Sequence, residues 1–576
     1  MKSSNELRTS LRSIDHKSYP AYKSLAGIYQ FNNFYLSIDH VQGDPFASPS
    51  SLHIEILHKV AAFPPTYYER DCSRIALQDF LTRQFASQFE DYNFKAKGSG
   101  KSGLLSITRC GQEVLDRSAC EITDSKVIAR FHVGFPAFGR TINAGELEKI
   151  LFDFLPRCVE NSFFYKKLDP KKVEAAVFLS EDQEAIRSIL KEEKMVAFVA
   201  NGAILPRKSG VSDLPMKDSV PFSSPAAMER TFVLPHKGEI TGMAIPQGIT
   251  LIVGGGYHGK STLLEALQTG VYNHIAGDGR EYVITDDTAV KLRAEDGRSV
   301  RNVDISLFIN DLPNKKDTKC FSTPDASGST SQAAGVIEHI EADARLFLID
   351  EDTSATNFML RDDFMQQVIS REKEPITPFL ERARDLYEQA GISTILVAGS
   401  SGAFFYIADK ILQMDCYRPL DITKHVKSLC KEHTAPRIQA PGFCIPDDKR
   451  TLPPFHRKTR EKRDYRSGNR QPDNRHEHMK IKGFGKDSFS LDKETIDLRY
   501  VEQLADSEQT NALAHLLRYA LEQVIDGKRT VRQTIQILSD TLDKKGWDPF
   551  CGSYIPCGLA KPRLQEIYAC LNRFRG

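Results

Sequence analysis

The sequence has no long hydrophobic run, no paired cysteines and almost no net charge. Its apolar stretches are strand-sized, far below the roughly 20 residues of a membrane span, and the N-terminus lacks the apolar core of a signal peptide. The cysteines stand singly, without a C-x-x-C pair, which argues against a disulfide framework and a zinc site. A net charge of +1 gives no overall attraction to nucleic acid or membrane. We expect a cytoplasmic protein with reduced thiols.

The length of the chain predicts several domains. At 576 residues it exceeds what one hydrophobic core supports, so roughly two to four domains are expected. Apolar patterns, proline-rich passages and charge runs predict four segments. They are an N-terminal α/β domain (1–225), a core of alternating strands and helices (226–425), a basic segment (426–490) and a helical C-terminal domain (491–576).

The stretch around residue 250 has the pattern of a phosphate-binding loop. Leu251–Val253 predicts a buried strand, and a helix is expected from Lys260 to about Leu267. Between them, a glycine, four residues and then Gly-Lys-Ser complete the loop pattern. Loop N–H groups and the helix N-terminus attract phosphate, Lys260 would reach the β- and γ-phosphates, and Ser261 would ligate Mg²⁺. We predict that ATP is bound by Gly254, Gly255, Gly256, Tyr257, His258, Gly259, Lys260, Ser261 and Thr262.

Two alternatives remain at this loop. A chance glycine-rich turn would have the same composition, but it would not require the flanking strand and helix. The His258 side chain could contact phosphate or a neighbouring subunit. Alternatively, its side chain points away while its N–H contacts phosphate, which we favour.

A pair of carboxylates ends another candidate strand. Four apolar residues precede Asp350 and Glu351, which predicts a central strand whose C-terminal end meets the phosphates. Asp350 would then hold Mg²⁺ through water, and Glu351 would polarise the attacking water. A kinase would not need the adjacent glutamate, so the pair favours hydrolysis. The alternative is a strand end with two solvated acids.

Two stretches resemble the ABC-class ATPases. The residues from Ser327 to Ser329 are similar to the Leu-Ser-Gly-Gly-Gln signature of that superfamily, and 350–356 is similar to its Walker B motif and D-loop. The resemblance implies a head-to-tail homodimer in which the signature contacts the γ-phosphate bound by the other subunit. A helix N-terminus can reach that phosphate only if dimerisation delivers it. Read alone, this serine-rich stretch is typical of a flexible linker. The implied ATP contacts are Ser327, Gly328, Ser329 and the D-loop residue Ser354.

More narrowly, the chain resembles the family of predicted ATPases of the ABC class. The resemblance implies an α/β fold with an ABC-type P-loop NTPase core, an N-terminal α/β domain and a mainly helical C-terminal region. It also implies ATP and Mg²⁺ as cofactors, and RNA held in a basic channel of a dimer. The shared stretches are His40–Ser50, Gly254–Thr262, Tyr272–Ile275, Gly277–Glu281, Ala294–Arg298 and Asp350–Met359.

Two departures from the wider ABC pattern affect the predicted chemistry. Gly399 stands where a switch histidine is expected, so backbone N–H groups or Ser400 would have to contact the γ-phosphate. We therefore predict Glu351, Lys260 and Ser400 as catalytic residues. No clear Q-loop glutamine lies in 285–325, and Phe232 is a candidate to stack on the base.

Two basic stretches are candidate nucleic-acid contacts. Between residues 449 and 486, thirteen Lys and Arg face four acidic residues, about +9, and a mobile segment is expected there. The loop 95–103 contains Gly-Lys-Ser but lacks the first glycine and a preceding strand, so it is predicted to be a flexible hairpin tip or a basic finger. A solvated linker is the alternative for both. The candidate contacts are Lys95, Lys97, Lys101, Arg457, Lys458 and Arg460.

The leading hypothesis is a Mg²⁺-dependent ABC-type ATPase whose ATP-closed homodimer clamps a nucleic-acid strand, with RNA favoured. Two other hypotheses stay open. The chain could be a P-loop phosphotransferase acting on a small molecule, or a subunit that binds ATP as a switch and hydrolyses it very slowly.

Overall fold

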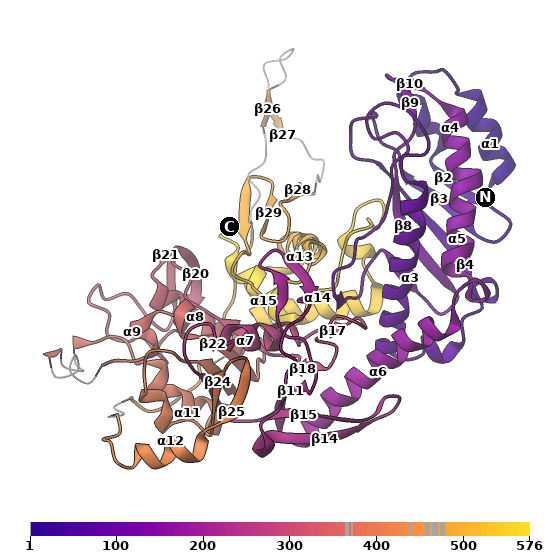
Figure 1. The fold of residues 1–576 in the computed structure, drawn as a ribbon. Coiled ribbons are helices and arrows are strands. Elements are labelled where there is room, and N and C mark those ends of the chain that lie inside the picture. The colour runs from indigo at the N-terminus through magenta and orange to yellow at the C-terminus, as the bar shows by residue number, and fades with distance from the viewer. Residues whose placement is uncertain are drawn as a thin grey trace.

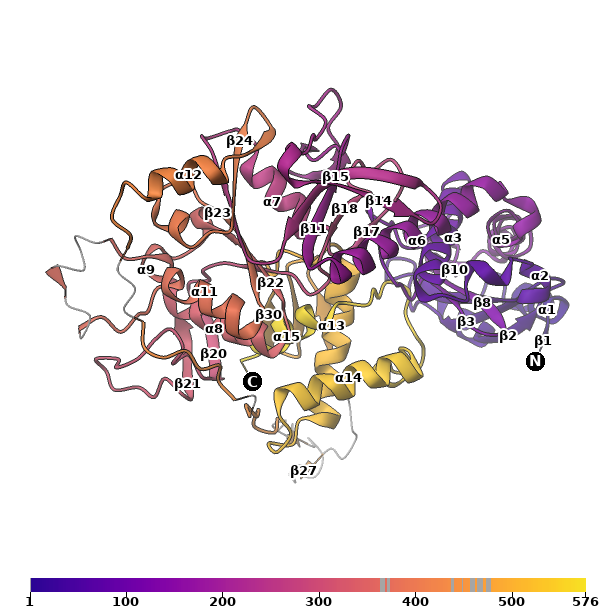
Figure 2. The ribbon, with the colours of Figure 1, turned by 90° about the horizontal axis from the view of Figure 1, so that it is seen from below.

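The computed structural model describes residues 2–362, 368–369, 373–436, 440–447, 449–455, 461–463, 470–472 and 478–575. Figure 1 shows the N-terminal region, in indigo, at one end of the molecule and the phosphate-loop core near the other end. The C-terminal helices, in yellow, lie between them, and the view from below in Figure 2 agrees with this arrangement.

The N-terminal region is built on a seven-stranded sheet. Its helices cover the sheet, and α3 packs against both α5 and α6. The strands are β1 (Lys2–Ser3), β2 (Gly27–Gln30), β3 (Tyr35–His40), β4 (Ser50–Leu57), β5 (Leu105–Ser106), β7 (Cys120–Ile122) and β8 (Lys126–Val133). The helices are α1 (Ser4–Ser13), α2 (His58–Ala61), α3 (Asp71–Tyr92), α4 (Ala144–Lys149), α5 (Leu155–Phe163) and α6 (Pro170–Glu192).

The stretch 95–103 is a loop fixed to the N-terminal region. The N–H of Lys101 donates to the carbonyl of Pro45, and the N–H of Gly103 donates to the carbonyl of Gly134. The stretch joins α3 to β5 and does not connect two strands, so the expectation of a hairpin tip is wrong. Two further pairs of short strands are present: β9 (Ala137–Phe138) with β10 (Thr141–Ile142), and β6 (Glu113–Val114) with β17 (Asn273–His274).

The core contains a six-stranded sheet in the order β19-β22-β23-β16-β24-β25. Its strands run parallel except for β25, which is antiparallel to β24. Parallel strands buried on both faces read as apolar runs, as the residues of β16 and β22 do. The strands are β16 (Ile249–Val253), β19 (Val290–Leu292), β22 (Leu346–Asp350), β23 (Ser393–Val397), β24 (Lys410–Asp415) and β25 (Arg418–Asp421).

Helices and smaller sheets surround this parallel sheet. One apolar cluster joins α7 to the strands β11, β15 and β18 of a four-stranded antiparallel sheet, ordered β14-β15-β11-β18. The helices are α7 (Lys260–Thr269), α8 (Gly328–Glu341), α9 (Thr356–Met359), α11 (Phe379–Ala390) and α12 (Thr423–Cys430). The other strands are β11 (Met195–Ala200), β12 (Arg207–Ser209), β13 (Ser212–Pro215), β14 (Glu229–Leu234), β15 (Gly238–Pro246), β18 (Val283–Thr285), β20 (Arg298–Val303) and β21 (Phe321–Ala326).

The C-terminal region packs helices against a three-stranded sheet. Its elements are β28 (Ile481–Gly483), β29 (Ser488–Leu491), β30 (Glu494–Asp497), α13 (Ser507–Tyr519), α14 (Val531–Lys545) and α15 (Leu564–Arg573). Before them, β26 (Glu461–Arg463) pairs with β27 (Arg470–Pro472). The buried Arg117 joins this region to the N-terminal sheet, because its guanidinium contacts Asp506 at 2.9 Å and Glu508 at 2.6 Å.

Candidate nucleotide-binding site

The phosphate loop connects β16 to α7, as the sequence predicts. Gly254 has a φ of 143°, and a Cβ placed on it would lie 2.5 Å from the carbonyl oxygen of Met414. Gly259 caps α7 with a φ of 94°, so both positions use the freedom of glycine. Tyr257 adopts a φ of 64° and is 99% exposed at the tip of the loop.

The loop surrounds the ammonium group of Lys260. Its Nζ donates to the carbonyl oxygens of Gly254 and Gly255, at 2.8 Å each. The His258 side chain turns away from these carbonyls toward the hairpin of β24 and β25, where its Nδ1 accepts the N–H of Cys416 at 3.0 Å. Ser261 is exposed in the first turn of α7. The loop thus presents one cation and a helix N-terminus at the same place, which suits phosphate.

The carboxylates at the end of β22 lie in two different environments. Asp350 is buried and accepts the N–H of Asp352 at 3.2 Å. Glu351 is half-buried, and one of its oxygens accepts the N–H groups of Gly399 at 2.7 Å and Ser400 at 2.9 Å. The loop at the switch position therefore holds the predicted base through its backbone.

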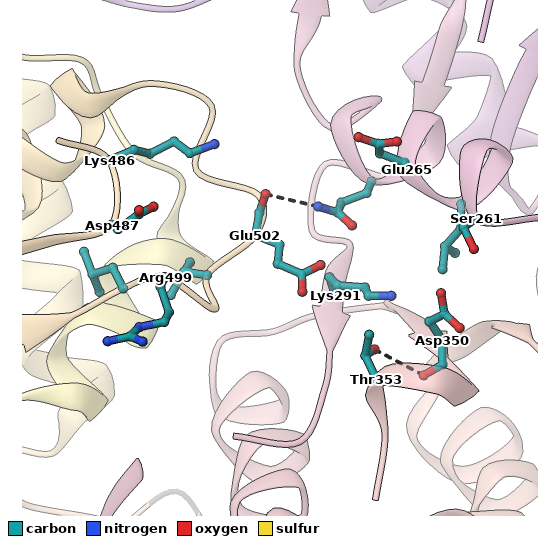
Figure 3. Close-up of a pocket in the computed structure, with 13 residues that line it drawn as sticks. Ser261, Glu265, Lys291, Asp350, Thr353, Lys486, Asp487, Arg499 and Glu502 are labelled. Carbon is teal, nitrogen blue, oxygen red and sulfur yellow. Dashed lines mark hydrogen bonds between the residues drawn. The ribbon is translucent and has the colours of Figure 1, made fainter. Parts of the chain in front are cut away.

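Ser261 and Asp350 line one cavity of about 370 Å³. Figure 3 shows the Lys291 side chain, from β19, pointing toward the gap between them. Burial lowers the pKa of Lys291, while Glu502 and Asp350 oppose that shift. The sequence analysis did not single out Lys291, because its apolar neighbours Val290 and Leu292 indicate only a short strand.

The C-terminal region forms the far wall of this cavity. Lys486, Asp487, Arg499 and Glu502 line it from that side, as Figure 3 shows. The wall is held by Gln503, whose side chain accepts the N–H of Lys291 at 3.0 Å and donates to the carbonyls of Gln268 and Ala289. The site is therefore shared between the core and the C-terminal region.

The oxygen donors of the cavity fit a magnesium ion. A serine hydroxyl and a carboxylate are the ligand types that Mg²⁺ accepts, usually together with water and phosphate oxygens. Ser261 and Asp350 supply these groups from α7 and β22. The Asp350 backbone is fixed as well, because its carbonyl accepts the hydroxyls of Thr353 and Ser354.

The predicted signature lies at the N-terminus of α8. Ser327 is the N-cap, is exposed and has its hydroxyl 3.0 Å from that of Thr330. Gly328 and Ser329 are buried, and a Cβ on Gly328 would lie 3.3 Å from Ala294. The first amides of a helix have no intrahelical partner. Within the described part of the chain, Ser327 is not among the residues lining the cavity.

Gln332 connects α8 to the strand end that carries Asp350. Its side-chain amide donates to the hydroxyl of Ser354 at 3.0 Å and accepts the N–H of Ala355 at 2.9 Å. The Ser354 hydroxyl in turn donates to the Asp350 carbonyl at 2.9 Å. Ser354 is thus bonded within its own chain, in a network that the motif alone did not reveal.

Other predicted residues lie away from the cavity. Phe232 is 3% exposed and packs on Phe198, so the suggestion that it stacks on the base is wrong. Lys95 lies over the ring of Tyr92, 4.9 Å from its centre, and Lys97 donates to the carbonyl of Phe94. Lys101 belongs to the same loop. Arg457, Lys458 and Arg460 lie outside the described residues.

Three family models match the chain. The P-loop domain of the ABC_ATPase family matches 169–447, the N-terminal domain of ATPases of the ABC class matches 4–166, and the MRB1590 C-terminal domain matches 480–576. Across the described residues, no helix has both the length and the apolar character needed to cross a membrane.

One curated relative and two solved structures are similar to parts of the chain. The uncharacterized protein MJ1628 of Methanocaldococcus jannaschii is 29% identical over 258 residues, 42% of this chain and 55% of that protein. The chain therefore spans about half the length of this relative. The structure of cbiO1 from Clostridium perfringens, part of the ABC transporter complex cbiONQ, is 13% identical with a TM-score of 0.27, covering 42% of this chain and 93% of that one. The ADP conformation of MJ1267, an ATP-binding cassette of an ABC transporter, is 10% identical with a TM-score of 0.25, covering 41% and 95%.

Proposed function

Because the chain belongs to the family of ATPases of the ABC class, we propose that it hydrolyses ATP at a magnesium-dependent site completed by a second copy of itself. One observation carries this proposal. Ser261 of the phosphate loop and Asp350 of β22 line the same cavity, and Glu351 follows directly. A loop that attracts phosphate thus lies beside a metal-type donor pair and a carboxylate suited to activating water.

Each group in the site has a definite task. The loop amides and Lys260 bind the β- and γ-phosphates, and Ser261 and Asp350 hold the metal. Mg²⁺, when bound there, neutralises phosphate charge. Glu351 accepts the proton of the attacking water. The N–H groups of Gly399 and Ser400 fix the orientation of the Glu351 carboxylate. Ser400 acts here through its backbone.

A second copy completes the site through α8. Ser327 is exposed at the N-terminus of the 14-residue helix α8. The first amides of this helix can therefore face a partner's γ-phosphate. This arrangement gives two composite sites related by two-fold symmetry. Within one chain, Gln332 links α8 to Asp350 through Ser354. A movement of α8 on closure at one site would therefore change the position of Asp350 at the other site.

The closed homodimer clamps a nucleic-acid strand, with RNA favoured. Support comes from the resemblance described above and from the basic composition of 449–486. Binding that rests on phosphate contacts weakens steeply as salt rises. A salt-independent affinity would contradict this half of the proposal.

Size-exclusion chromatography of Glu351→Gln tests pairing and cargo together. The variant should hydrolyse ATP about 10²–10⁴-fold more slowly, because it lacks the base, and should elute as a dimer with ATP and Mg²⁺. An RNA oligomer should co-elute with that dimer. Asp352→Asn is the matched control. It also removes one carboxylate charge, but at the exposed residue next to Glu351. Undiminished hydrolysis in Glu351→Gln would overturn the role of Glu351, and a monomer with ATP would overturn the composite site.

One observation favours a second candidate, a subunit that binds ATP as a switch and turns over very slowly. Gly399 supplies no imidazole at the switch position, and its N–H is directed at Glu351. If this candidate is correct, the unaltered chain should itself elute as a stable ATP-bound dimer, with little inorganic phosphate released.

A further inference from the structure

The hairpin of β24 and β25 packs directly on the phosphate loop. Asp415 pairs with Arg418, which leaves Cys416 and Tyr417 as a two-residue turn. The Cys416 N–H donates to the His258 Nδ1 at 3.0 Å, and the Tyr417 N–H donates to the His258 carbonyl at 3.2 Å. His258 therefore meets this turn through both its backbone and its side chain.

The turn keeps two strained residues at the point of contact. Cys416 has a φ of 45° and Tyr417 a φ of 68°. Two-residue hairpin turns with positive φ at both positions normally use Asn-Gly or Gly-Gly. Strained non-glycine residues persist where the surrounding structure over-determines them, and they cluster at functional sites.

Three metal-ligand types converge at this contact. An imidazole nitrogen of His258, a carboxylate oxygen of Asp415 and the Cys416 sulfur all lie within 4.8 Å of one another. The side chains of His258 and Asp415 are 35% and 53% exposed, and Cys416 is also exposed, so an ion can reach the cluster. Among the described residues, no other group of three or more His, Cys, Asp or Glu side chains brings its ligand atoms this close together.

Two contacts of the His258 Nδ1 compete with each other. The Cys416 N–H requires a lone pair on Nδ1, whereas the Asp415 oxygen, 3.2 Å away, requires a proton or another positive charge between the two atoms. A metal ion on Nδ1 would displace the Cys416 N–H from that lone pair and would supply the positive charge that the Asp415 oxygen requires. Nitrogen and oxygen ligands about 2.0–2.2 Å from Zn²⁺ lie about 3.3–3.6 Å apart in a tetrahedron, so the 3.2 Å between the His258 Nδ1 and the Asp415 oxygen would have to lengthen only slightly.

We propose that His258, Asp415 and Cys416 form a Zn²⁺ site. A thiolate, an imidazole and a carboxylate together suit Zn²⁺, whereas Mg²⁺ prefers oxygen ligands alone. Three protein ligands leave a fourth position for water. The cysteines are isolated from one another in the sequence, which argued against such a site. The fold, however, brings His258 to a cysteine 158 positions further along the chain.

Zinc at this site would tie the phosphate loop to the β24–β25 hairpin. Because His258 belongs to the loop, zinc and nucleotide affinities are linked, and each ligand must change the affinity of the other by the same factor. This inference does not depend on hydrolysis, since metal binding has its own spectroscopic readout.

Cobalt titration of the chelator-treated full chain tests the proposal. Co²⁺ bound by the site should give a sulfur-to-cobalt charge-transfer absorption in the near ultraviolet, and Zn²⁺ should displace it. Cys416→Ser should abolish this absorption, and Asp415→Asn should weaken Zn²⁺ binding at least about tenfold. Cys320→Ser removes another exposed thiol and should leave the signal intact.

Two results of the cobalt titration would overturn the zinc site. Cobalt at Ser261 and Asp350 would give no thiolate absorption, so binding without that signal would overturn the proposal. Persistence of the signal in Cys416→Ser would also overturn it. Far-ultraviolet circular dichroism of each variant checks that loss of the signal does not reflect loss of the fold.

Discussion

Gly254→Ala should destabilise the core strongly while changing only one methyl group. The new Cβ would lie 2.5 Å from the backbone carbonyl oxygen of Met414, and no flexible side chain can yield there. The φ of 143° also lies in a region that side chains disfavour. Strain of about 1–2 kcal/mol from the dihedral and about 1–3 kcal/mol from overpacking gives a total of about 2–5 kcal/mol.

Thermal unfolding followed by fluorescence measures this effect. Since 1 kcal/mol shifts the melting temperature of a domain of 150–250 residues by about 2–4 °C, the transition should fall by several degrees. The matched control is Gly256→Ala in the same loop, where an added Cβ meets nothing within 4 Å and φ lies outside the positive region. If both variants have the same melting temperature, the close approach of Gly254 to the Met414 carbonyl does not constrain the loop, and the prediction is wrong. Gly254→Ala should also lose ATP affinity, because the loop must shift to clear the clash.

Three further predictions follow from buried or exposed charges. Arg117→Ala should destabilise the chain by about 3–5 kcal/mol in urea titrations, since it leaves Asp506 and Glu508 without their shared cation in a buried setting; unchanged stability would contradict the bridge. Burial lowers the pKa of His339 to about 4, so the unfolded state binds more protons between about pH 6.5 and 4. Stability should therefore fall as pH falls through that window, by an amount on the order of 3 kcal/mol, and His339→Gln should flatten the profile. Ser327→Glu should leave or slightly raise stability, because a carboxylate suits a helix N-terminus. The same variant should lose ATP-dependent pairing in size-exclusion chromatography, because that carboxylate would repel a partner's γ-phosphate; pairing at the wild-type level would contradict the composite site.

The elements that bear the motifs could be predicted from the sequence, because local patterns determine them. The strand before Gly254, the helix after Lys260 and the strand ending at Asp350 all lie within a few residues of their expected positions. Each combines an apolar run with a defined turn, and such signals need no knowledge of the rest of the chain.

Contacts between distant segments were not accessible in the same way. Lys291 reaches the cavity only because β19 pairs with β22, and its apolar neighbours show no more than a strand. The meeting of His258 with Cys416 depends on β16 and β24 being neighbours in the sheet. Phe232 has an aromatic ring that could stack on a base, yet tertiary packing buries this ring against Phe198. Such pairings come from the order of strands, which a single sequence does not specify.

The position of Gln503 bears on how this protein can be dissected. A fragment that stops before this residue would uncover the free side of β19, and an uncovered strand readily joins a strand of another molecule. Such a truncated core would self-associate through its cut surface, with or without nucleotide. Pairing driven by ATP can therefore be judged only on a chain that keeps Gln503 and the residues after it.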